Sequence, residues 1–343
     1  MTFSETLLSW YETQHRKLPW RETHDPYYIW VSEIILQQTR VLQGMNYYVN
    51  FIKRFPSLDS LAQAGEQEVM KAWEGLGYYN RARNLHFTAK KIRQQKNGFF
   101  PQHYEGLIQL KGIGTYTAAA IASICFKEPV PAIDGNAYRV LSRHFGLYDD
   151  ISVAKSKKRF MDLGRQIIHQ TAPGDFNQAV MELGSTICTR KQAQCQKCPV
   201  NDSCFALQNK AVYQLPVKTK KNSVKQRFFY YLFLSSDQGI WIQCRRDADI
   251  WKGLYELPLI HSAQFFSPTE VQKAMYNTFD VLAAPIYQLT HKLTHQNLHI
   301  EFWEGHAQKN TKEKLEGFEL VATDMLDKYP FPRPISLFLK NKK

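Results

Sequence analysis

The chain has 343 residues, of which 44% are hydrophobic and 22% charged, values that suit a folded protein of two domains. No run of residues approaches the roughly 18–20 apolar residues of a membrane-spanning helix, and the N-terminus has no secretion-signal pattern. We therefore expect a cytoplasmic protein, nucleoid-associated if bacterial, without a membrane partner and in a reducing environment. Lys and Arg number 44 against 31 Asp and Glu, a formal charge of +13 that favours a polyanion as partner. An unspecialised basic surface is the alternative.

Residues 1–208 have the periodicity of helices. Apolar residues recur at spacings of three and four, as in Val31, Ile34 and Ile35, and Pro and Gly separate such segments. Asp25 followed by Pro26 is a typical helix start. The pattern predicts an all-α domain over this range.

Glu33 lies on the helix that begins at Asp25–Pro26. Its neighbours one turn away are Ile29, Trp30, Leu36 and Gln37, and three of these four are apolar. Such surroundings raise the pKa of a carboxyl, so Glu33 could hold a proton at neutral pH. A solvated surface glutamate is the alternative interpretation.

Residues 107–126 contain a turn, Gly112-Ile113-Gly114, followed by an Ala-rich helix near Thr115. The two glycines permit close approach of another backbone, and the free N–H groups of the helix start suit a phosphate oxygen. The turn lacks the GK[ST] ending of a P-loop, so a nucleoside triphosphate is a poor fit. An ordinary corner between two helices is the alternative.

Asp134 directly precedes a predicted helix over 136–145. Aspartate favours the N-cap position, and the positive end of a helix favours an ionised carboxylate. An ionised Asp134 could stabilise or attack the sugar cation that forms when a glycosidic bond breaks.

Four of the six cysteines lie in one loop, 188–204, with the spacing Cys188-x6-Cys195-x2-Cys198-x5-Cys204. The spacing suits a [4Fe–4S] cluster, because a zinc site usually comes from two separated pairs. Zinc, a redox role and chance remain alternatives at this point. The isolated Cys125 and Cys244 are expected to be core thiols.

The pattern changes after residue 208. Residues 209–227 are polar and basic, as in a linker. Aromatic and β-branched runs then predict strands at 228–236, 239–246, 285–294 and 298–305, and Ser267 with Glu270 predicts a capped helix over 267–279. A smaller α+β domain over 228–343 is therefore expected.

Three of these motifs resemble the endonuclease III and MutY class of DNA glycosylases. The cysteine spacing resembles the cluster loop of that class, "LKGIGTYT" resembles its helix–hairpin–helix, and "DPYYIWVSEIILQQTRV" resembles the MutY active-site helix. The resemblance implies a structural [4Fe–4S] cluster held by Cys188, Cys195, Cys198 and Cys204.

The resemblance also implies site residues. In the MutY family, the acid at the position of Glu33 protonates the adenine, and the aspartate at the position of Asp134 completes the catalytic pair; Tyr116 and Asn136 belong to the same site. "LPWR" and "FNQAVMELG" imply an adenine pocket that contains Trp20, Arg21 and Gln178, the last at a position where relatives often carry Glu. The implied contacts to DNA come from the hairpin and from "LQQT" and "GLGYY", elements that wedge into the duplex: Gly112, Gly114, Gln38, Thr39, Leu76 and Tyr78.

Bifunctional members of the class carry a Schiff-base lysine two residues after the second hairpin glycine. Here that residue is Tyr116, so the resemblance implies a monofunctional enzyme.

"WKGLYELPLI" (251–260) resembles a stretch of Nudix-like domains, but residues 239–305 lack the dense set of Glu that a Nudix hydrolase needs for its metal. The MutY family uses such a domain to check the base opposite adenine, through a Phe-Ser-His hairpin. This chain has Leu293-Thr294-His295, which implies that Thr294 and His295 contact the DNA.

The expectation is a multidomain protein. An all-α helix–hairpin–helix glycosylase domain with a cluster loop (1–208) is followed by a linker (209–227) and an α+β Nudix-like domain (228–343). As a monomer it would remove adenine paired with 8-oxoguanine or guanine in duplex DNA. An endonuclease III-like glycosylase/lyase, a non-catalytic iron–sulfur DNA-binding regulator and an electron carrier are the alternatives.

Overall fold

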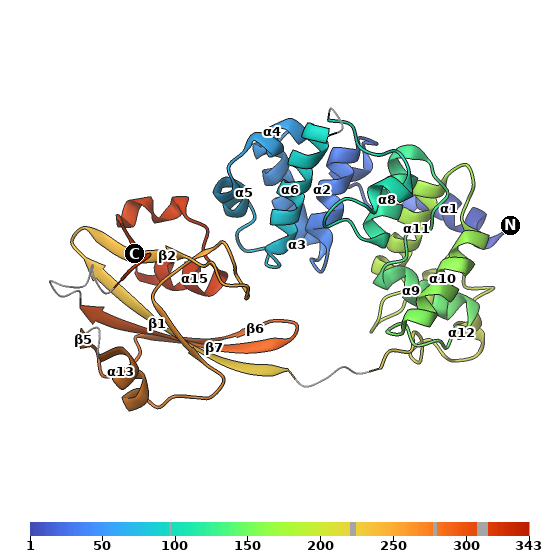
Figure 1. The fold of residues 1–343 in the computed structure, drawn as a ribbon. Helices are drawn as coiled ribbons and strands as arrows, with labels where there is room; N and C mark the ends of the chain where they lie inside the picture. Colours follow the sequence, from blue (N-terminus) through green and yellow to red (C-terminus); the bar gives the residue numbers. More distant parts are fainter. Residues whose placement is uncertain (96–97, 220–223, 277–279, 307–314, 343) are drawn as a thin grey trace. The chain divides into compact units, whose positions relative to one another are not determined.

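The computed structural model describes residues 1–95, 98–219, 224–276, 280–306 and 315–342 (Figure 1). They form two compact units, one of Met1–Gln63 with Asn84–Lys220 and the other of Ala64–Arg83 with Lys221–Lys343. None of the helices in these ranges is long and apolar enough to cross a membrane.

The described part of the first unit is helical throughout, as predicted. Its longer helices are α1 (Phe3–Gln14), α2 (Pro26–Leu36), α3 (Val41–Arg54), α4 (Leu58–Gln63), α6 (Asn80–Gln95, which begins in the second unit), α8 (Thr115–Phe126), α9 (Gly135–Phe145), α10 (Ala154–Ile167) and α11 (Pro173–Thr186). Short turns of helix are η1 (Pro19–Arg21), α7 (Tyr104–Leu107), η2 (Cys195–Lys197) and α12 (Phe205–Gln208).

Helix α11 is the centre of this unit, because it packs against α1, α8 and α9. Its apolar face places Phe176, Ala179, Val180 and Leu183 in the core. Pro173 occupies the first turn, where a missing N–H costs nothing. The remaining face of α11 is free to carry polar groups toward a site.

The predicted helix starts at Asp25 and Asp134 are confirmed. The Asp25 carboxylate accepts from the backbone N–H of Tyr27 at 2.8 Å, and Asp134 accepts from those of Asn136 and Ala137 at 2.9 and 2.7 Å. Each side chain thus satisfies N–H groups that the helix itself cannot.

The two glycines of the hairpin before α8 have different physical roles. Gly112 has a φ of +84°, and a Cβ there would lie 2.6 Å from Cβ of Asn84, so only glycine fits. Gly114 has an ordinary φ of −91° and is the N-cap of α8, and a Cβ there would meet no neighbour within 4 Å. The start of α8 is therefore open to an incoming group.

The sheet of the second unit has the order β3-β2-β1-β7-β5, with β4 paired to β1, β6 to β7 and β8 to β2. The strands are β1 (Lys225–Ser236), β2 (Gly239–Cys244), β3 (Tyr255–Glu256), β4 (Leu259–Ser262), β5 (Asp280–Val281), β6 (Tyr287–Lys292), β7 (Gln296–His306) and β8 (Glu319–Val321). The helices are α5 (Glu66–Ala72), α13 (Pro268–Tyr276), η3 (Thr323–Lys328) and α15 (Arg333–Lys342). The four strands predicted from the sequence correspond to β1, β2, β6 and β7.

Strand β1 is the centre of this sheet, paired in parallel with β7. Its alternate residues Tyr230 and Leu232 join a core that includes Val271 of α13. On the other face, Tyr231 stacks on Phe302 of β7, which stacks in turn on Phe338 of α15 with centroids 4.1 Å apart. Burial on both faces explains why this strand is continuously hydrophobic in sequence.

The predicted capping of α13 is confirmed, since Ser267 and Glu270 exchange hydrogen bonds between side chain and backbone N–H at 2.7 and 3.4 Å. The last residues of that predicted helix, 277–279, lie outside the described residues. In the segment expected to be a linker, Leu215 is buried among residues of the first unit, and β1 begins at Lys225.

Candidate active site

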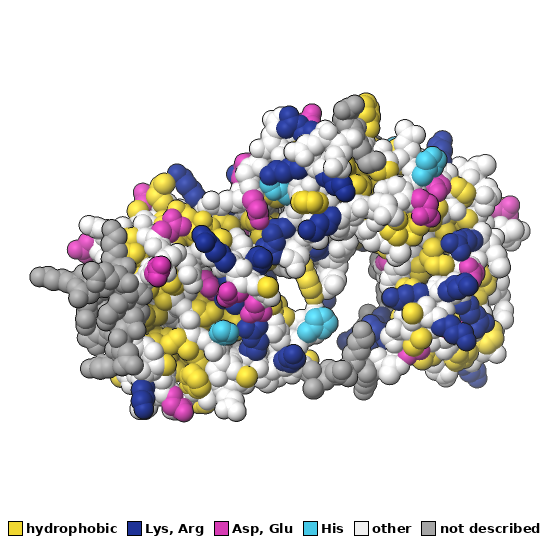
Figure 2. All heavy atoms as spheres, viewed as in Figure 1, with side chains coloured by type: hydrophobic (Ala, Val, Ile, Leu, Met, Phe, Trp, Pro, Cys, Tyr) yellow, Lys and Arg dark blue, Asp and Glu magenta, His cyan; other side chains and the backbone are white. Residues whose placement is uncertain are grey.

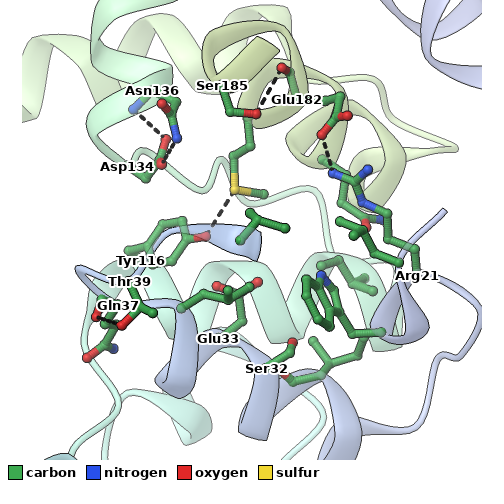
Figure 3. Close-up of a pocket in the computed structure, with 18 of the residues that line it drawn as sticks. Arg21, Ser32, Glu33, Gln37, Thr39, Tyr116, Asp134, Asn136, Glu182 and Ser185 are labelled. Atoms are coloured by element: carbon green, nitrogen blue, oxygen red, sulfur yellow. Dashed lines mark hydrogen bonds and ion pairs between the residues drawn. The ribbon is translucent and has the colours of Figure 1, made fainter. Parts of the chain in front are cut away.

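A cavity of about 460 Å³ opens within the first unit (Figure 3). Its walls come from α2, α8, the start of α9, α11 and the turn η1. Nine of the residues predicted from the sequence line it: Trp20, Arg21, Glu33, Gln38, Thr39, Tyr116, Asp134, Asn136 and Gln178. The fold thus gathers segments from residues 20 to 178 around one space.

Glu33 extends from α2 into this cavity and is only 8% exposed. Burial raises its pKa to about 7, and the negative charge of Asp134 acts in the same direction, against a hydrogen bond with Tyr116 and the charge of Arg21. The predicted rise in pKa is confirmed. Near neutral pH, a substantial fraction of Glu33 holds a proton that it can donate.

Tyr116 lies at the start of α8, beside Glu33. Its hydroxyl donates to the sulfur of Met181 at 3.0 Å, and burial raises its pKa well above the ordinary value. Tyr116 is therefore a neutral hydroxyl at working pH. Among the described residues that line the cavity, none is a lysine.

Asp134 caps the start of α9. Its position there was expected to keep the carboxyl ionised, and it does accept hydrogen bonds from the helix start. Burial nevertheless outweighs these bonds, so the pKa of Asp134 is raised from its ordinary value. The free-energy cost of removing the ionised carboxyl from water exceeds the stabilisation that the helix start gives to it.

A chain of hydrogen bonds leads from Asp134 to the cysteine loop. Asn136 donates to Asp134 at 2.8 Å, and Arg139 donates to the Asn136 side chain at 2.7 Å and to the backbone oxygen of Cys188 at 2.7 Å. A further bond from Arg139 reaches the backbone oxygen of Gly184 at 2.6 Å. These contacts hold the start of α9 against the end of α11.

Gly184 makes that contact possible. A Cβ at this position would lie 2.6 Å from Cβ and 3.1 Å from Cα of Asn136. Because this is closer than real side chains approach one another, a larger residue would push the start of α9 away from α11.

The four loop cysteines are unbridged and half-buried. Burial, with the charges of the other three thiols, raises the pKa of Cys198 to about 12, so the four lie near one another. The buried guanidinium of Arg143 donates to the Cys188 sulfur at 3.3 Å and to the Thr189 backbone oxygen at 2.8 Å. In the described ranges, no group of three or more His, Cys, Asp or Glu is arranged to hold a metal ion. Four thiolates from one short loop nevertheless match the donor set of a cluster in which each of four irons takes one sulfur ligand.

One wall of the cavity was not predicted from the sequence. Glu182 of α11, with its side chain 1% exposed, forms ion pairs with Arg16 at 2.6 Å and Arg21 at 2.8 Å. Glu182 lies four residues after Gln178, hence on the same face of the helix, and this spacing was the available signal. Its two partners lie more than 160 positions away in the chain, so no local sequence pattern predicts that they pair with Glu182.

The remaining predicted DNA contacts lie outside the cavity. Tyr78 is 46% exposed, and its hydroxyl contacts that of Thr294 at the exposed tip between β6 and β7, next to His295. Tyr78 has a φ of +48° and Gln38 a φ of +58°, strained values that often mark functional positions. Leu76 is buried.

A basic surface covers part of the helical unit. On the face seen in Figure 2, Lys and Arg gather around α9 and α10, where Lys155, Lys157 and Lys158 are exposed.

Comparison with known proteins settles the family. The family model of the HhH-GPD superfamily of base excision DNA repair proteins matches residues 31–166, and a NUDIX domain model matches 229–341. The adenine DNA glycosylase of Buchnera aphidicola from Schizaphis graminum is 35% identical over 301 residues, which cover 87% of this chain and 86% of that protein. The chain belongs to the adenine DNA glycosylase family.

The human adenine DNA glycosylase is 42% identical over 222 residues, 62% of this chain and 41% of the human protein. A thermostable thymine-DNA glycosylase has a related structure, with a TM-score of 0.55 and 27% identity over 60% of this chain and 95% of that chain. An endonuclease III–DNA covalent intermediate, at 19% identity and a TM-score of 0.52 over the same share of this chain, shows the fold alone.

These matches confirm the predicted fold class, a helix–hairpin–helix unit followed by a Nudix-like unit with a mixed sheet. The chain is a DNA glycosylase of base excision repair, an enzyme that hydrolyses N-glycosidic bonds. Proteins of the HhH-GPD superfamily, whose family model matches residues 31–166, typically bind a [4Fe–4S] cluster.

Proposed function

We propose that this enzyme removes adenine paired with 8-oxoguanine or with guanine in duplex DNA, without cutting the strand itself. The observation that carries the proposal is the convergence of Glu33, Tyr116 and Asp134 on one cavity, with the pKa of Glu33 near 7. A protonated acid and a second carboxyl are the groups that acid-assisted loss of a purine needs.

In this mechanism, Glu33 donates its proton to N7 of adenine, which makes the departing base a better leaving group. As the bond to the sugar breaks, positive charge develops on the sugar, and the ionised form of Asp134 stabilises it. Asn136 holds the Asp134 carboxyl in place through its 2.8 Å hydrogen bond. Water then adds to the sugar cation and gives up a proton to the ionised Glu33, which leaves an abasic site and restores the protonated acid.

The adenine must leave the base stack to reach Glu33, because the cavity lies among helices of the first unit. Trp20, Arg21 and Gln178 line the cavity and would contact the flipped base. Gln38, Thr39, Leu76 and Tyr78 would support the space that it leaves in the duplex, and Gly112 and Gly114 would let a phosphate approach α8.

The absence of a lysine among the described cavity residues supports a monofunctional reaction, since no amine is placed to form a Schiff base with the sugar. For the opposite base, the exposed Thr294 and His295 support recognition of 8-oxoguanine, because the Thr294 hydroxyl can accept from the N7–H that guanine lacks.

Cys188, Cys195, Cys198 and Cys204 would hold a [4Fe–4S] cluster. The cluster would cross-link the loop and stabilise the DNA-binding surface, and protein groups alone would carry out the reaction at the adenine.

We also propose that the helical domain spans residues 1–208, the linker 209–227 and the Nudix-like domain 228–343, and that the enzyme is a monomer.

The test is a single-turnover assay on duplexes that differ only at the target pair. Adenine opposite 8-oxoguanine and adenine opposite guanine should lose their base, whereas a thymine glycol duplex should remain intact. The product strand should break only after alkali. The Glu33→Gln variant should bind the mispaired duplexes but release no adenine, because an amide has no proton to give. Strand breaks without alkali, or wild-type rates from Glu33→Gln, would contradict the proposal.

A further inference from the structure

We propose that Glu182 is a positioning residue that holds Arg21 away from Glu33 and so keeps the catalytic acid protonated at neutral pH. The inference rests on the proposed function and adds to it a group that does not touch the base. Figure 3 shows the arrangement, with Arg21 directed to Glu182 on the far side of the cavity from Asp134.

Arg21 is a buried cation, with a side chain 9% exposed. Its guanidinium donates to Glu182 at 2.8 Å and to the backbone oxygen of Arg16 at 3.1 Å, and it lies 5.4 Å from the centre of the Tyr11 ring. A buried guanidinium needs an anion nearby, because its transfer from water is costly. In this structure, that anion is Glu182.

Glu182 is fully occupied by the two arginines. Its Oε1 accepts from the Arg16 Nε at 2.6 Å and backbone N–H at 3.1 Å, and its Oε2 accepts from Arg16 at 2.7 Å and from Arg21 at 2.8 Å. Burial raises the pKa of Glu182, but the bonds from Arg16 and Arg21 outweigh it and bring the pKa to about 2. Glu182 is thus ionised at any pH at which the enzyme works.

Glu33 is the group that the loss of Glu182 would affect. Among the described residues, the charged or titratable groups that act on it are Tyr116 on α8, Asp134 at the start of α9 and Arg21 on η1, and the charge of Glu33 acts in turn on Cys125 of α8. Arg21 is the one cation of this set, and it already lowers the pKa of Glu33.

Without the Glu182 carboxylate, the buried charge of Arg21 would be free to turn toward Glu33. An arginine beside a carboxyl lowers its pKa by about 1–3 units. Glu33 would then be ionised at neutral pH and could not protonate adenine. By this argument, Glu182 sets the pH range in which the acid works.

The experiment measures single-turnover adenine release from an adenine·8-oxoguanine duplex between about pH 5 and pH 9. In the wild type, the rate should fall with rising pH as Glu33 loses its proton. In Glu182→Gln, which keeps the shape but removes the charge, this fall should move about one pH unit or more toward acid. One unit corresponds to about a tenfold smaller protonated fraction of Glu33 at pH 8.

Two further variants separate charge from structure. Arg21→Gln should move the fall toward alkaline pH, because the cation that lowers the pKa of Glu33 is gone. In the double variant Glu182→Gln/Arg21→Gln, the pH at which the rate falls should return close to that of the wild type, even if the maximal rate is lower. Arg16→Gln is the matched control, since it removes one partner of Glu182 but leaves Arg21 paired.

A rate of Glu182→Gln that drops equally at every pH would overturn the inference, because it indicates a purely structural role. If Glu182→Gln does not fold, Arg21→Gln decides: an unchanged pH profile would overturn the inference, and a shift to alkaline pH supports it. Failure of the proposed function gives a different result, because the wild type would then release no adenine, or Glu33→Gln would release it at the wild-type rate.

Discussion

Replacement of Glu33 by glutamine should remove activity and at the same time stabilise the fold. The pKa of Glu33 is raised from an ordinary 4.5 to about 7, chiefly by burial. The folded chain therefore binds this proton more tightly than the unfolded chain does. Below about pH 4.5, Glu33 is protonated in both states and does not reduce the free energy of unfolding. As the pH rises to about 7, the unfolded chain ionises first, and the free energy of unfolding falls.

The size of the effect follows from the shift. A rise of roughly 2.5 units, at about 1.4 kcal/mol per unit, costs the folded state about 3 kcal/mol once Glu33 is ionised. Glutamine has nearly the same shape and no charge at any pH. Above neutral pH, Glu33→Gln should thus be more stable than the wild type by about 3 kcal/mol, and much of this advantage should vanish near pH 5.

The assay is urea unfolding of both proteins at about pH 5 and about pH 8.5, followed by circular dichroism of the helices. The variant's advantage should grow by about 2–3 kcal/mol between the two conditions. Glu22→Gln, at an exposed position close in sequence, is the control and should show no such growth. An advantage of equal size at both pH values, or a less stable variant at pH 8.5, would refute the argument from burial.

Three other predictions concern neighbouring features. Gly184→Ala should lower the rate of adenine release more than it weakens DNA binding, because the new Cβ would meet Asn136 at 2.6 Å and displace the start of α9; single-turnover rates and binding of an uncleavable duplex check this. Cys198→Ser should lose the iron–sulfur absorbance together with stability and DNA binding, and a colourless wild type with bound zinc would contradict the cluster. Tyr116→Lys should become trappable on DNA by borohydride, because an amine would then lie beside the sugar; efficient trapping of the wild type would instead indicate a lyase.

Local features of this protein were predictable from the sequence. The helix starts at Asp25 and Asp134, the capping of α13 by Ser267 and the central strand β1 all depend on residues close together in the chain. Such signals act through the backbone within one or two turns, so the order of residues suffices to find them. The apolar neighbours of Glu33 on its own helix predicted its raised pKa for the same reason.

Other features depended on the tertiary structure. Glu182 meets Arg16 and Arg21 across more than 160 positions, and Tyr78 meets Thr294 across 216, so no local pattern could pair them. The pKa of Asp134 rises because packing removes water from it, although a helix start by itself favours the ionised form. Desolvation and ion pairing are set by whatever segments the fold brings together. The sequence therefore indicated which groups are candidates for the chemistry, whereas only the folded chain decided their pKa shifts and their partners.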